Sequence, residues 1–377
     1  MYCVFILYSY LTCFKNNKKY FTKLTVFFKP LGEYRSLWSL ATLKLSSTLA
    51  EAVFSEIEKN NESQEIKHLS EAKDIENVLE KIDQIVDLVE KSRKKGILTT
   101  AEAEEKYDEI VDTLEDLIEI IKIPENAHTF LTIKGVEKIL SLIVETGYER
   151  LKKQVLIVIK TLFNVAPSTT TLLIPVPVVD KLLDIFEHDP NLALKTHAID
   201  IMYVWLPNNP RVQARVMKVK GLEPFYDQVS KLDASVIYTL LDLFNTILEE
   251  HVRARNDTSF KSHSLDKKLY QQIGLIERMS TPQVCTGLLN IFEIILPFKD
   301  KNEQFTKVII ELMKNIKPFC LKMYLNKSRP LRIFKALKSY FADNMGVFVK
   351  LSFDSTEVMM LLEEYSKKLN DNARDEF

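Results

Sequence analysis

The sequence predicts an all-α protein built as a solenoid, in which small helical units stack one after another. Three observations support this class. Glycine is scarce, with 8 residues in 377, whereas glycine-rich phosphate loops and tightly turning β-sheets need more of it. Apolar residues recur with helical periodicity along most of the chain. One pattern also returns at a constant step, which is the signature of internal repeats.

The repeated pattern is a helix opening that recurs every 43 residues, over 135–140, 178–183 and 221–226. Each opening follows a turn and carries an acidic residue in its first turn, where the carboxylate faces the positive end of the helix dipole. The step lies in the armadillo/HEAT range. We therefore predict an armadillo/HEAT-like right-handed superhelical solenoid with about four central repeats and helical caps.

The helix that follows each opening repeats one apolar face at the same step. Its residues are spaced i, i+3, i+7, so they share one side of a helix. We expect them to form a continuous core: Val155, Val158 and Leu162, then Ala198, Ile201 and Trp205, then Leu241, Phe244 and Leu248.

A fourth unit is predicted after an insertion. Gly274 has the same kind of opening but lies 53 residues after Gly221. The extra length falls in 252–264, a polar stretch that indicates a loop. We expect the second helix of this unit over 282–298, with Leu288, Ile291 and Ile295 on its apolar face.

These patterns divide the chain into six parts. Thr100 is the expected start of the second capping helix, and Pro297 and Pro318 are expected to mark helix ends. The predicted parts are 1–54, a leader with a candidate signal sequence; 55–73, a polar linker; 74–124, N-terminal capping helices; 125–298, the repeats; 299–370, C-terminal capping helices; and 371–377, a tail.

The tail predicts the compartment. Arg374, Asp375, Glu376 and Phe377 resemble the K-D-E-L class of endoplasmic-reticulum retrieval signals, which a receptor reads through the two acids and the free carboxylate. An ordinary acidic tail is the alternative. Candidate glycosylation sites are found at Asn61, Asn256 and Asn326. We therefore expect a protein of the endoplasmic reticulum lumen.

No pattern of catalysis or cofactor binding is found in the sequence. There is no Walker loop, no G-x-S-x-G and no helical zinc pair, so we expect no enzyme, no cofactor and no metal. Cys285 and Cys320 lie in apolar helical patterns and are interpreted as buried thiols rather than a disulfide. With 51 basic and 52 acidic residues, the chain has no global field toward nucleic acid or an anionic membrane, so we expect no nucleic-acid partner and no stable membrane insertion. We also expect a monomer.

Two stretches of the sequence resemble a known family. They are Pro124–Ala127 before Gly135-Val136, and Arg211–Arg215 before Lys220-Gly221-Leu222. In these stretches the chain is similar to the SIL-type lumenal branch of the armadillo-type heat-shock-70 exchange factors. The similarity extends over roughly Asp74 to Leu325, and Val178 stands where the family has a glycine.

The resemblance implies a function without bond chemistry. Such a protein binds the nucleotide-binding domain of the lumenal heat-shock-70 chaperone BiP with its concave face, stabilises an open cleft and promotes ADP release, which supports protein folding and translocation. Three alternatives remain. They are a cytosolic armadillo scaffold, a cytosolic heat-shock-70 exchange factor, and an enzyme with scattered catalytic residues.

Helical phase alone supplies the candidate partner contacts. Residues on the non-core side of the second helices are Lys160, Asn164, Tyr203, Asn290 and Glu293. For each of them the alternative is an ordinary solvated surface residue. The loop at 252–264 is a further candidate.

Overall fold

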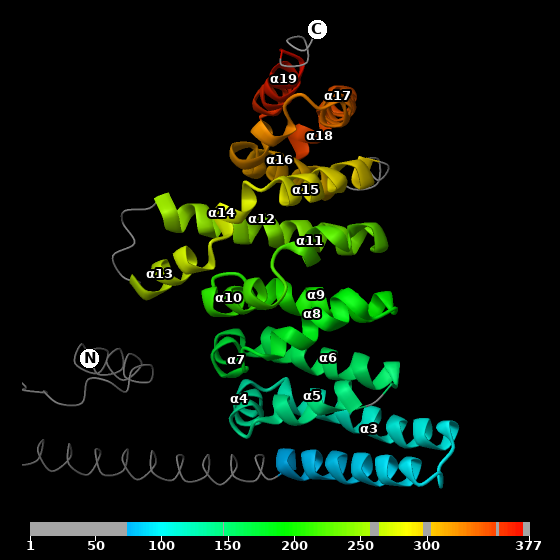
Figure 1. The fold of residues 1–377 in the computed structure, drawn as a ribbon. Helices are drawn as coiled ribbons and strands as arrows, with labels where there is room; N and C mark the ends of the chain where they lie inside the picture. Colours follow the sequence, from blue (N-terminus) through cyan, green and yellow to red (C-terminus); the bar gives the residue numbers. More distant parts are fainter. Residues whose placement is uncertain (1–73, 146, 257–263, 297–302, 352–353, 372–377) are drawn as a thin grey trace, which may run out of the picture. The chain divides into compact units, whose positions relative to one another are not determined.

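The computed structural model describes residues 74–145, 147–256, 264–296, 303–351 and 354–371, all within one compact unit of the chain, 66–377. Every regular element among them is a helix (Figure 1). They are a helix over 74–94, α3 Thr100–Ile121, α4 Pro124–Thr132, α5 Gly135–Glu145, α6 Glu149–Val165, α7 Pro167–Leu173, α8 Val178–His188, α9 Leu192–Trp205, α10 Pro210–Val219, α11 Glu223–Asp227, η1 Val229–Lys231, α12 Ala234–Asn256, α13 Ser264–Ile273, α14 Leu275–Met279, α15 Pro282–Ile295, α16 Glu303–Tyr324, α17 Ser328–Asp343, α18 Met345–Lys350 and α19 Ser355–Asp371.

Five of these helices form a row in which each packs against the next. The order is α3, α6, α9, α12, α16, and we call these five the helix row. A middle helix packs on each later member, namely α5 on α6, α8 on α9, α11 on α12 and α15 on α16 (Figure 1). A short helix, a middle helix and a row helix thus recur as a unit. This confirms the predicted all-α, armadillo-like solenoid.

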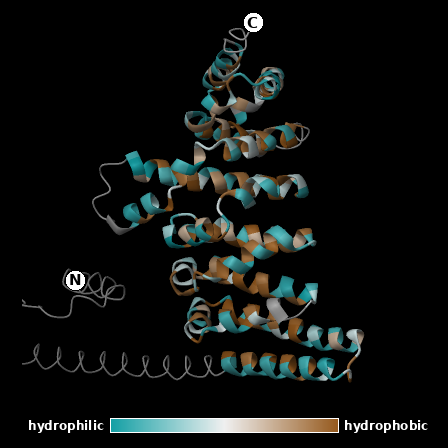
Figure 2. Cartoon of the chain, viewed as in Figure 1, coloured by the Kyte–Doolittle hydropathy of each residue, from teal (hydrophilic) through white to brown (hydrophobic). Residues whose placement is uncertain are grey.

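The predicted core of the row is confirmed residue by residue. None of the nine side chains assigned to the shared face of α6, α9 and α12 is more than 4% exposed. The ring centroids of Phe163 and Trp205 lie 5.8 Å apart across the α6–α9 contact. Figure 2 shows that the helices carry both a hydrophobic and a hydrophilic side. Burial of each large apolar side chain stabilises the fold by roughly 1.5–3 kcal/mol, so the repeated face is the main source of cohesion.

The fourth unit differs from the prediction in which helix joins the row. The helix that packs against α12 is α16, whereas α15 packs between α11 and α16. A glycine explains this position, because a Cβ at Gly287 would lie 2.4 Å from the Tyr226 ring of α11. The apolar face of α15 is buried as expected, but α15 is the middle helix of its unit.

The turns before α11 and α14 explain Gly221 and Gly274, and the turn before α8 explains why Val178 can replace a glycine. Gly221 has φ 73° and Gly274 has φ 64°, a left-handed conformation that favours glycine. Val178 needs no such freedom, because Pro177 before it is right-handed, with φ −60°. The Val178 N–H donates to the Pro175 carbonyl at 3.0 Å, so a proline-based turn starts this helix.

One predicted boundary is confirmed and two are corrected. α3 starts at Thr100 as predicted, and Thr99 before it is the capping residue, in a capping box with Glu102. Pro318 lies inside α16, not at its end, since Ile316 and Cys320 on either side are both fully buried and hold the helix in place. The loop expected at 252–264 begins later, because α12 continues to Asn256.

The C-terminal cap contains more helix than the periodicity indicated. α16 and α19 both begin within the region predicted to form the C-terminal capping helices, 299–370. Between them lie two further helices, α17 and α18. α17 packs closely on α19, and the Phe334 and Tyr365 rings stack at 4.1 Å. No helix in the described parts of the chain has both the length and the apolar character needed to cross a membrane.

The cysteines of α15 and α16 form a disulfide, so the interpretation as separate thiols was wrong. Cys285 and Cys320 are at most 1% exposed and their Cα atoms are 5.3 Å apart. The Tyr324 hydroxyl donates to the Cys285 carbonyl at 2.8 Å and adds a second link between the helices. Periodicity indicated that both cysteines are buried, but it could not show that their two helix faces meet.

Candidate functional site

We call the solvent-facing side of the five row helices the row surface. Hydrogen bonds and ion pairs on this surface connect each row helix to the next. They join Tyr148 and Arg150 to Asp108, Lys160 to Asp200, Tyr203 to Asp242, and Asn315 to Glu249. All but the last of these bonds join residues about one repeat apart in the sequence, and the last spans 66 residues because the insertion lies between α12 and α16. These bonds hold neighbouring side chains in fixed positions, so the row surface is ordered before any partner arrives.

Three of the five predicted contacts lie together on this surface. Lys160 of α6 extends toward α9, and its Nζ lies 2.7 Å from the Asp200 carboxylate. Asn164 is exposed one helical turn further along α6. Tyr203 of α9 is 39% exposed and its hydroxyl donates to Asp242 of α12 at 2.5 Å. The helical phase therefore placed these residues on one surface.

Tyr203 combines a fixed hydroxyl with an accessible ring. The hydrogen bond to the Asp242 carboxylate, together with partial burial, raises the pKa of Tyr203 to about 12, so the hydroxyl stays protonated at neutral pH. A tyrosine held in this way offers a broad apolar contact at little cost in side-chain entropy. It is the strongest contact candidate on the row surface.

Asn290 and Glu293 lie elsewhere. Both are on α15, and the Arg329 guanidinium of α17 binds Asn290 at 2.8 Å and Glu293 at 3.1 Å. Arg332 also donates to Glu293, at 2.8 Å. Arg329, followed by weaker effects of Arg332, lowers the pKa of Glu293. These two side chains therefore connect α15 to α17 and are not part of the row surface.

One accessible apolar residue was missed. Val204 follows Tyr203 in α9 and is 41% exposed, which is unusual for a valine in the middle of a solenoid. Its neighbours in sequence are mostly apolar, so periodicity could not separate it from the core. Tyr203 and Val204 together form the apolar centre of an otherwise polar row surface.

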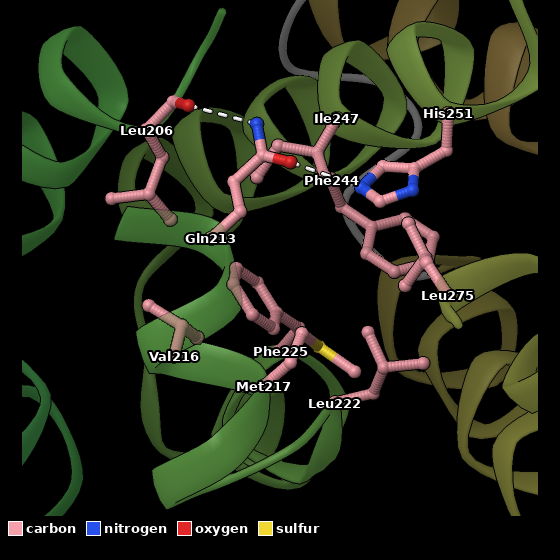
Figure 3. Close-up of a pocket in the computed structure, with 10 residues that line it drawn as sticks. All are labelled: Leu206, Gln213, Val216, Met217, Leu222, Phe225, Phe244, Ile247, His251 and Leu275. Carbon is pink, nitrogen blue, oxygen red and sulfur yellow. Dashed lines mark hydrogen bonds between the residues drawn. The ribbon is translucent and has the colours of Figure 1, made fainter. Parts of the chain in front are cut away.

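A buried polar cluster lies between α10, α12 and α13, behind the row surface. The Glu250 carboxylate accepts from the Asn208 N–H and the Gln213 amide, both at 2.9 Å, and from the Tyr270 hydroxyl at 3.2 Å. Gln213 also donates to the Leu206 carbonyl, and its oxygen lies 3.0 Å from Nε2 of His251 (Figure 3). The cluster joins one repeat to the next through buried hydrogen bonds.

The cavity beside this cluster is too small for a ligand. It is lined mainly by apolar side chains such as Val216, Phe225 and Phe244 (Figure 3), and its volume is about 20 Å³. That is room for about one water molecule. Nor do the described residues bring together three or more His, Cys, Asp or Glu side chains suited to a metal ion.

Comparison with protein families identifies the chain. The model of the SIL1/FES1/HPBP1 C-terminal domain matches residues 126–346. The chain belongs to this family. Its members are nucleotide exchange factors of heat-shock-70 chaperones, which act as non-catalytic cofactors. Neither the curated proteins nor the solved structures contain a match to the chain.

The part of the chain matched to the SIL1/FES1/HPBP1 family contains most of the helix row. It begins in α4 and ends in α18, so it includes α6, α9, α12 and α16 with the row surface that they carry. α3 and α19 lie outside it. The apolar pair Tyr203–Val204 is thus at the centre of the domain that defines the family.

Two of the predicted glycosylation sites of this family member, Asn256 and Asn326, lie among the described residues. Arg374–Phe377 and Asn61 lie outside the described residues. Asn256 is exposed at the end of α12, and Asn326 is exposed before α17 with φ 59°. The resemblance noted in the sequence is confirmed at the level of the family. The glycosylation sites and the retrieval signal stay predictions.

The buried cluster of this exchange factor predicts a pH dependence of stability. Burial, as the largest cause, lowers the pKa of His251 to about 4 from its ordinary value of 6.5. Because the pKa of His251 is lower in the folded state than in the unfolded state, the contribution of neutral His251 to stability is fully present above about pH 6.5. That contribution is lost as the pH falls toward 4. The loss at acidic pH is roughly 3 kcal/mol. Unfolding by urea from pH 7 to 4 will measure it.

A variant separates His251 from the other titrating groups. His251→Gln keeps a polar side chain but no longer titrates, so its unfolding free energy should fall less steeply over this range than that of the wild type. Glu250, whose pKa is raised by burial, is present in both chains and contributes similarly to both. If the unfolding free energies of the wild type and His251→Gln fell with pH at the same rate, His251 would not be the source of the pH dependence.

Proposed function

We propose that this protein is the exchange factor of the lumenal heat-shock-70 chaperone BiP. It binds the nucleotide-binding domain through the row surface, stabilises the open cleft and promotes ADP release in the endoplasmic reticulum. The family match over 126–346 carries the exchange-factor part of the proposal. The lumenal part is supported by the terminal Arg374–Phe377 sequence, by the three sequons and by the Cys285–Cys320 disulfide, since disulfides persist mainly in oxidising compartments.

The mechanism requires only a difference in affinity. A factor that binds the open nucleotide-binding domain a hundredfold more tightly than the closed one shifts that equilibrium by roughly 2.7 kcal/mol. The row surface suits this task, because its side chains are already held by bonds between neighbouring helices and lose little freedom on docking. ATP rebinding closes the domain and weakens the complex, so the factor is released.

The test of function is the release of a fluorescent ADP analogue from BiP, with and without the full chain. We expect release to become faster in proportion to the occupied fraction of BiP. A cytosolic heat-shock-70 protein serves as the comparison. No acceleration of BiP at saturating concentration would refute the assignment to BiP, and acceleration of the cytosolic protein alone would identify a cytosolic exchange factor.

The test of compartment uses the sequons at Asn256 and Asn326. Expressed in cells, the chain should shift in mobility on glycosidase treatment, and Asn256→Gln with Asn326→Gln should remove the shift apart from any contribution of Asn61. Deletion of Arg374–Phe377 should release the protein into the medium. An unglycosylated protein in the cytosol would refute the lumenal proposal.

Tyr203 provides a prediction for the binding surface. Tyr203→Ala should weaken binding to the nucleotide-binding domain about tenfold or more, because a central, partly buried tyrosine is a frequent binding hot spot. Tyr203→Phe keeps the ring and should stay within about threefold of the wild type. Calorimetric titration measures the affinities.

Leu172→Ala is the matched control. Leu172 is 82% exposed on α7, outside the helix row, so its truncation also removes accessible apolar surface but should leave the affinity unchanged. Equal losses for Tyr203→Ala and Leu172→Ala would contradict the row surface as the binding site. Thermal unfolding of each variant checks that the fold is retained.

A further inference from the structure

Two hollows lie beside α16, one on each side of Pro318. The first has a volume of about 440 Å³, lies between α12, α14 and α16, and is lined by the apolar side chains of Val252, Ile276 and Phe319. The second has a volume of about 570 Å³ and lies along α16 toward α19. Lys314 and Pro318 line both hollows. We call the pair the α16 groove.

The α16 groove is basic at its edges. Its second hollow is lined by four lysines, and two acidic side chains of α19 pair with three of them. The pairs are Lys314 with Glu357, Lys317 with Glu364, and Lys368 with Glu364. Lys322 is exposed beside them. Among the described residues, the lining of this second hollow contains four lysines and no acidic side chain, so its wall is positively charged, whereas the first hollow is lined by both Glu249 and Arg255.

This charge belongs to a gradient along the unit. Residues 74–121, at the N-terminal end, contain 15 acidic and 6 basic residues, whereas residues 303–371 contain 8 acidic and 12 basic residues. The chain as a whole is close to neutral, with a formal charge of −1, so the two ends offer different surfaces rather than one uniform field. A partner that contacts the whole row would be bound in one orientation.

We propose that the α16 groove binds an acidic segment of the partner chaperone that carries at least one apolar side chain. This rests on the proposed function, because the groove lies on α16, which continues the row surface beyond α12. The apolar side chain of the segment enters the hollow at Phe319, and its carboxylates face Lys322 and its neighbours. The contact fixes which end of the row meets which part of the nucleotide-binding domain.

Charge complementarity favours this occupant over an apolar or basic one. An apolar segment would offer no carboxylate to the exposed Lys322, and a basic segment would be repelled by the lysines. A second copy of the chain is the competing occupant, because its own 74–121 region is acidic. The experiment must therefore separate a chaperone segment from self-association.

The first measurement is binding of the nucleotide-binding domain by Lys322→Glu and Phe319→Ala variants of the full chain. Lys322→Glu should weaken binding about tenfold at low salt and much less at about 500 mM NaCl, where the Debye length falls to roughly 4 Å. Phe319→Ala should lose affinity at both salt concentrations. Lys335→Glu, an exposed lysine of α17 outside the groove, is the matched control and should change binding less than about twofold.

The second measurement identifies the occupant. A photoreactive phenylalanine analogue at position 319 should crosslink to a segment of the chaperone with net negative charge, and mass spectrometry locates it. Crosslinks only to a second copy of the chain, or to a basic chaperone segment, would overturn the proposal.

The outcomes separate the groove from the proposed function. If the wild-type chain accelerates ADP release while Lys322→Glu and Phe319→Ala bind as well as wild type, the groove proposal alone is refuted. If the wild-type chain neither binds the nucleotide-binding domain nor accelerates ADP release, both proposals fall together.

Discussion

Reduction of the Cys285–Cys320 disulfide is expected to lower the free energy of unfolding by roughly 4 kcal/mol. The bond closes a loop with a sequence separation of 35, and the chain-entropy model assigns a loop of this size about that much stabilisation. Both sulfurs are buried between α15 and α16, so reduction also leaves two thiols in a contact packed for a bond. Urea unfolding with and without a reductant measures the difference on one unmutated chain.

The control removes the bond permanently. Cys285→Ala with Cys320→Ala avoids placing a buried hydroxyl in the core, and this double variant should unfold at the same urea concentration whether or not reductant is present. A wild-type midpoint that does not respond to verified reduction would contradict the prediction. Loss of the disulfide should also weaken the row surface, because α16 forms its last part and α15 packs against α16.

The phases of α6, α9 and α12 could be predicted because they depend on local spacing. An apolar residue at i, i+3 and i+7 defines one side of a helix whatever the rest of the chain does, and the 43-residue step carries that side from Leu162 to Trp205 and Leu248. Each of these three is at most 1% exposed. The same phase placed Lys160, Asn164 and Tyr203 on the opposite, accessible side.

The order of the helices in the fourth unit could not be predicted in this way. α15 and α16 both have apolar faces of suitable length, so spacing alone favours the first in sequence. What places α15 in the middle position is the close approach of Gly287 to the Tyr226 ring, which is a tertiary contact. Asn290 and Glu293 were predicted as partner contacts because α15 was taken as the second helix of its unit, whereas α15 is a middle helix and both side chains bind Arg329 of α17.

The cysteine pair illustrates the same limit. A periodic pattern shows that Cys285 and Cys320 are both buried, but a disulfide also requires two Cα atoms within about 7 Å and suitably directed side chains. That geometry arises when α15 packs on α16. Val204 was missed for a related reason, since an exposed apolar residue in an apolar stretch looks like core.

The buried cluster around Glu250 supports the second large prediction, that Gln213→Leu lowers the free energy of unfolding by about 3 kcal/mol or more. The Gln213 amide donates to both the Leu206 carbonyl and the Glu250 carboxylate, and its oxygen faces His251. Leucine fills a similar volume but leaves these buried groups without that partner, and each unsatisfied group costs about 1–3 kcal/mol. The Glu250 carboxylate still accepts hydrogen bonds from the Asn208 N–H and the Tyr270 hydroxyl, so it loses only the donor that Gln213 supplied.

Gln271→Leu is the matched control for this substitution. Gln271 lies on α13 next to Tyr270 but is exposed, so the same chemical change should alter stability by no more than about 0.5 kcal/mol. The two variants are compared by urea unfolding at pH 7. Similar stabilities for both would show that the cluster contributes little. A large loss for Gln213→Leu alone would show that the bonds among α10, α12 and α13 hold successive repeats together, and hence hold α12 in place within the row surface.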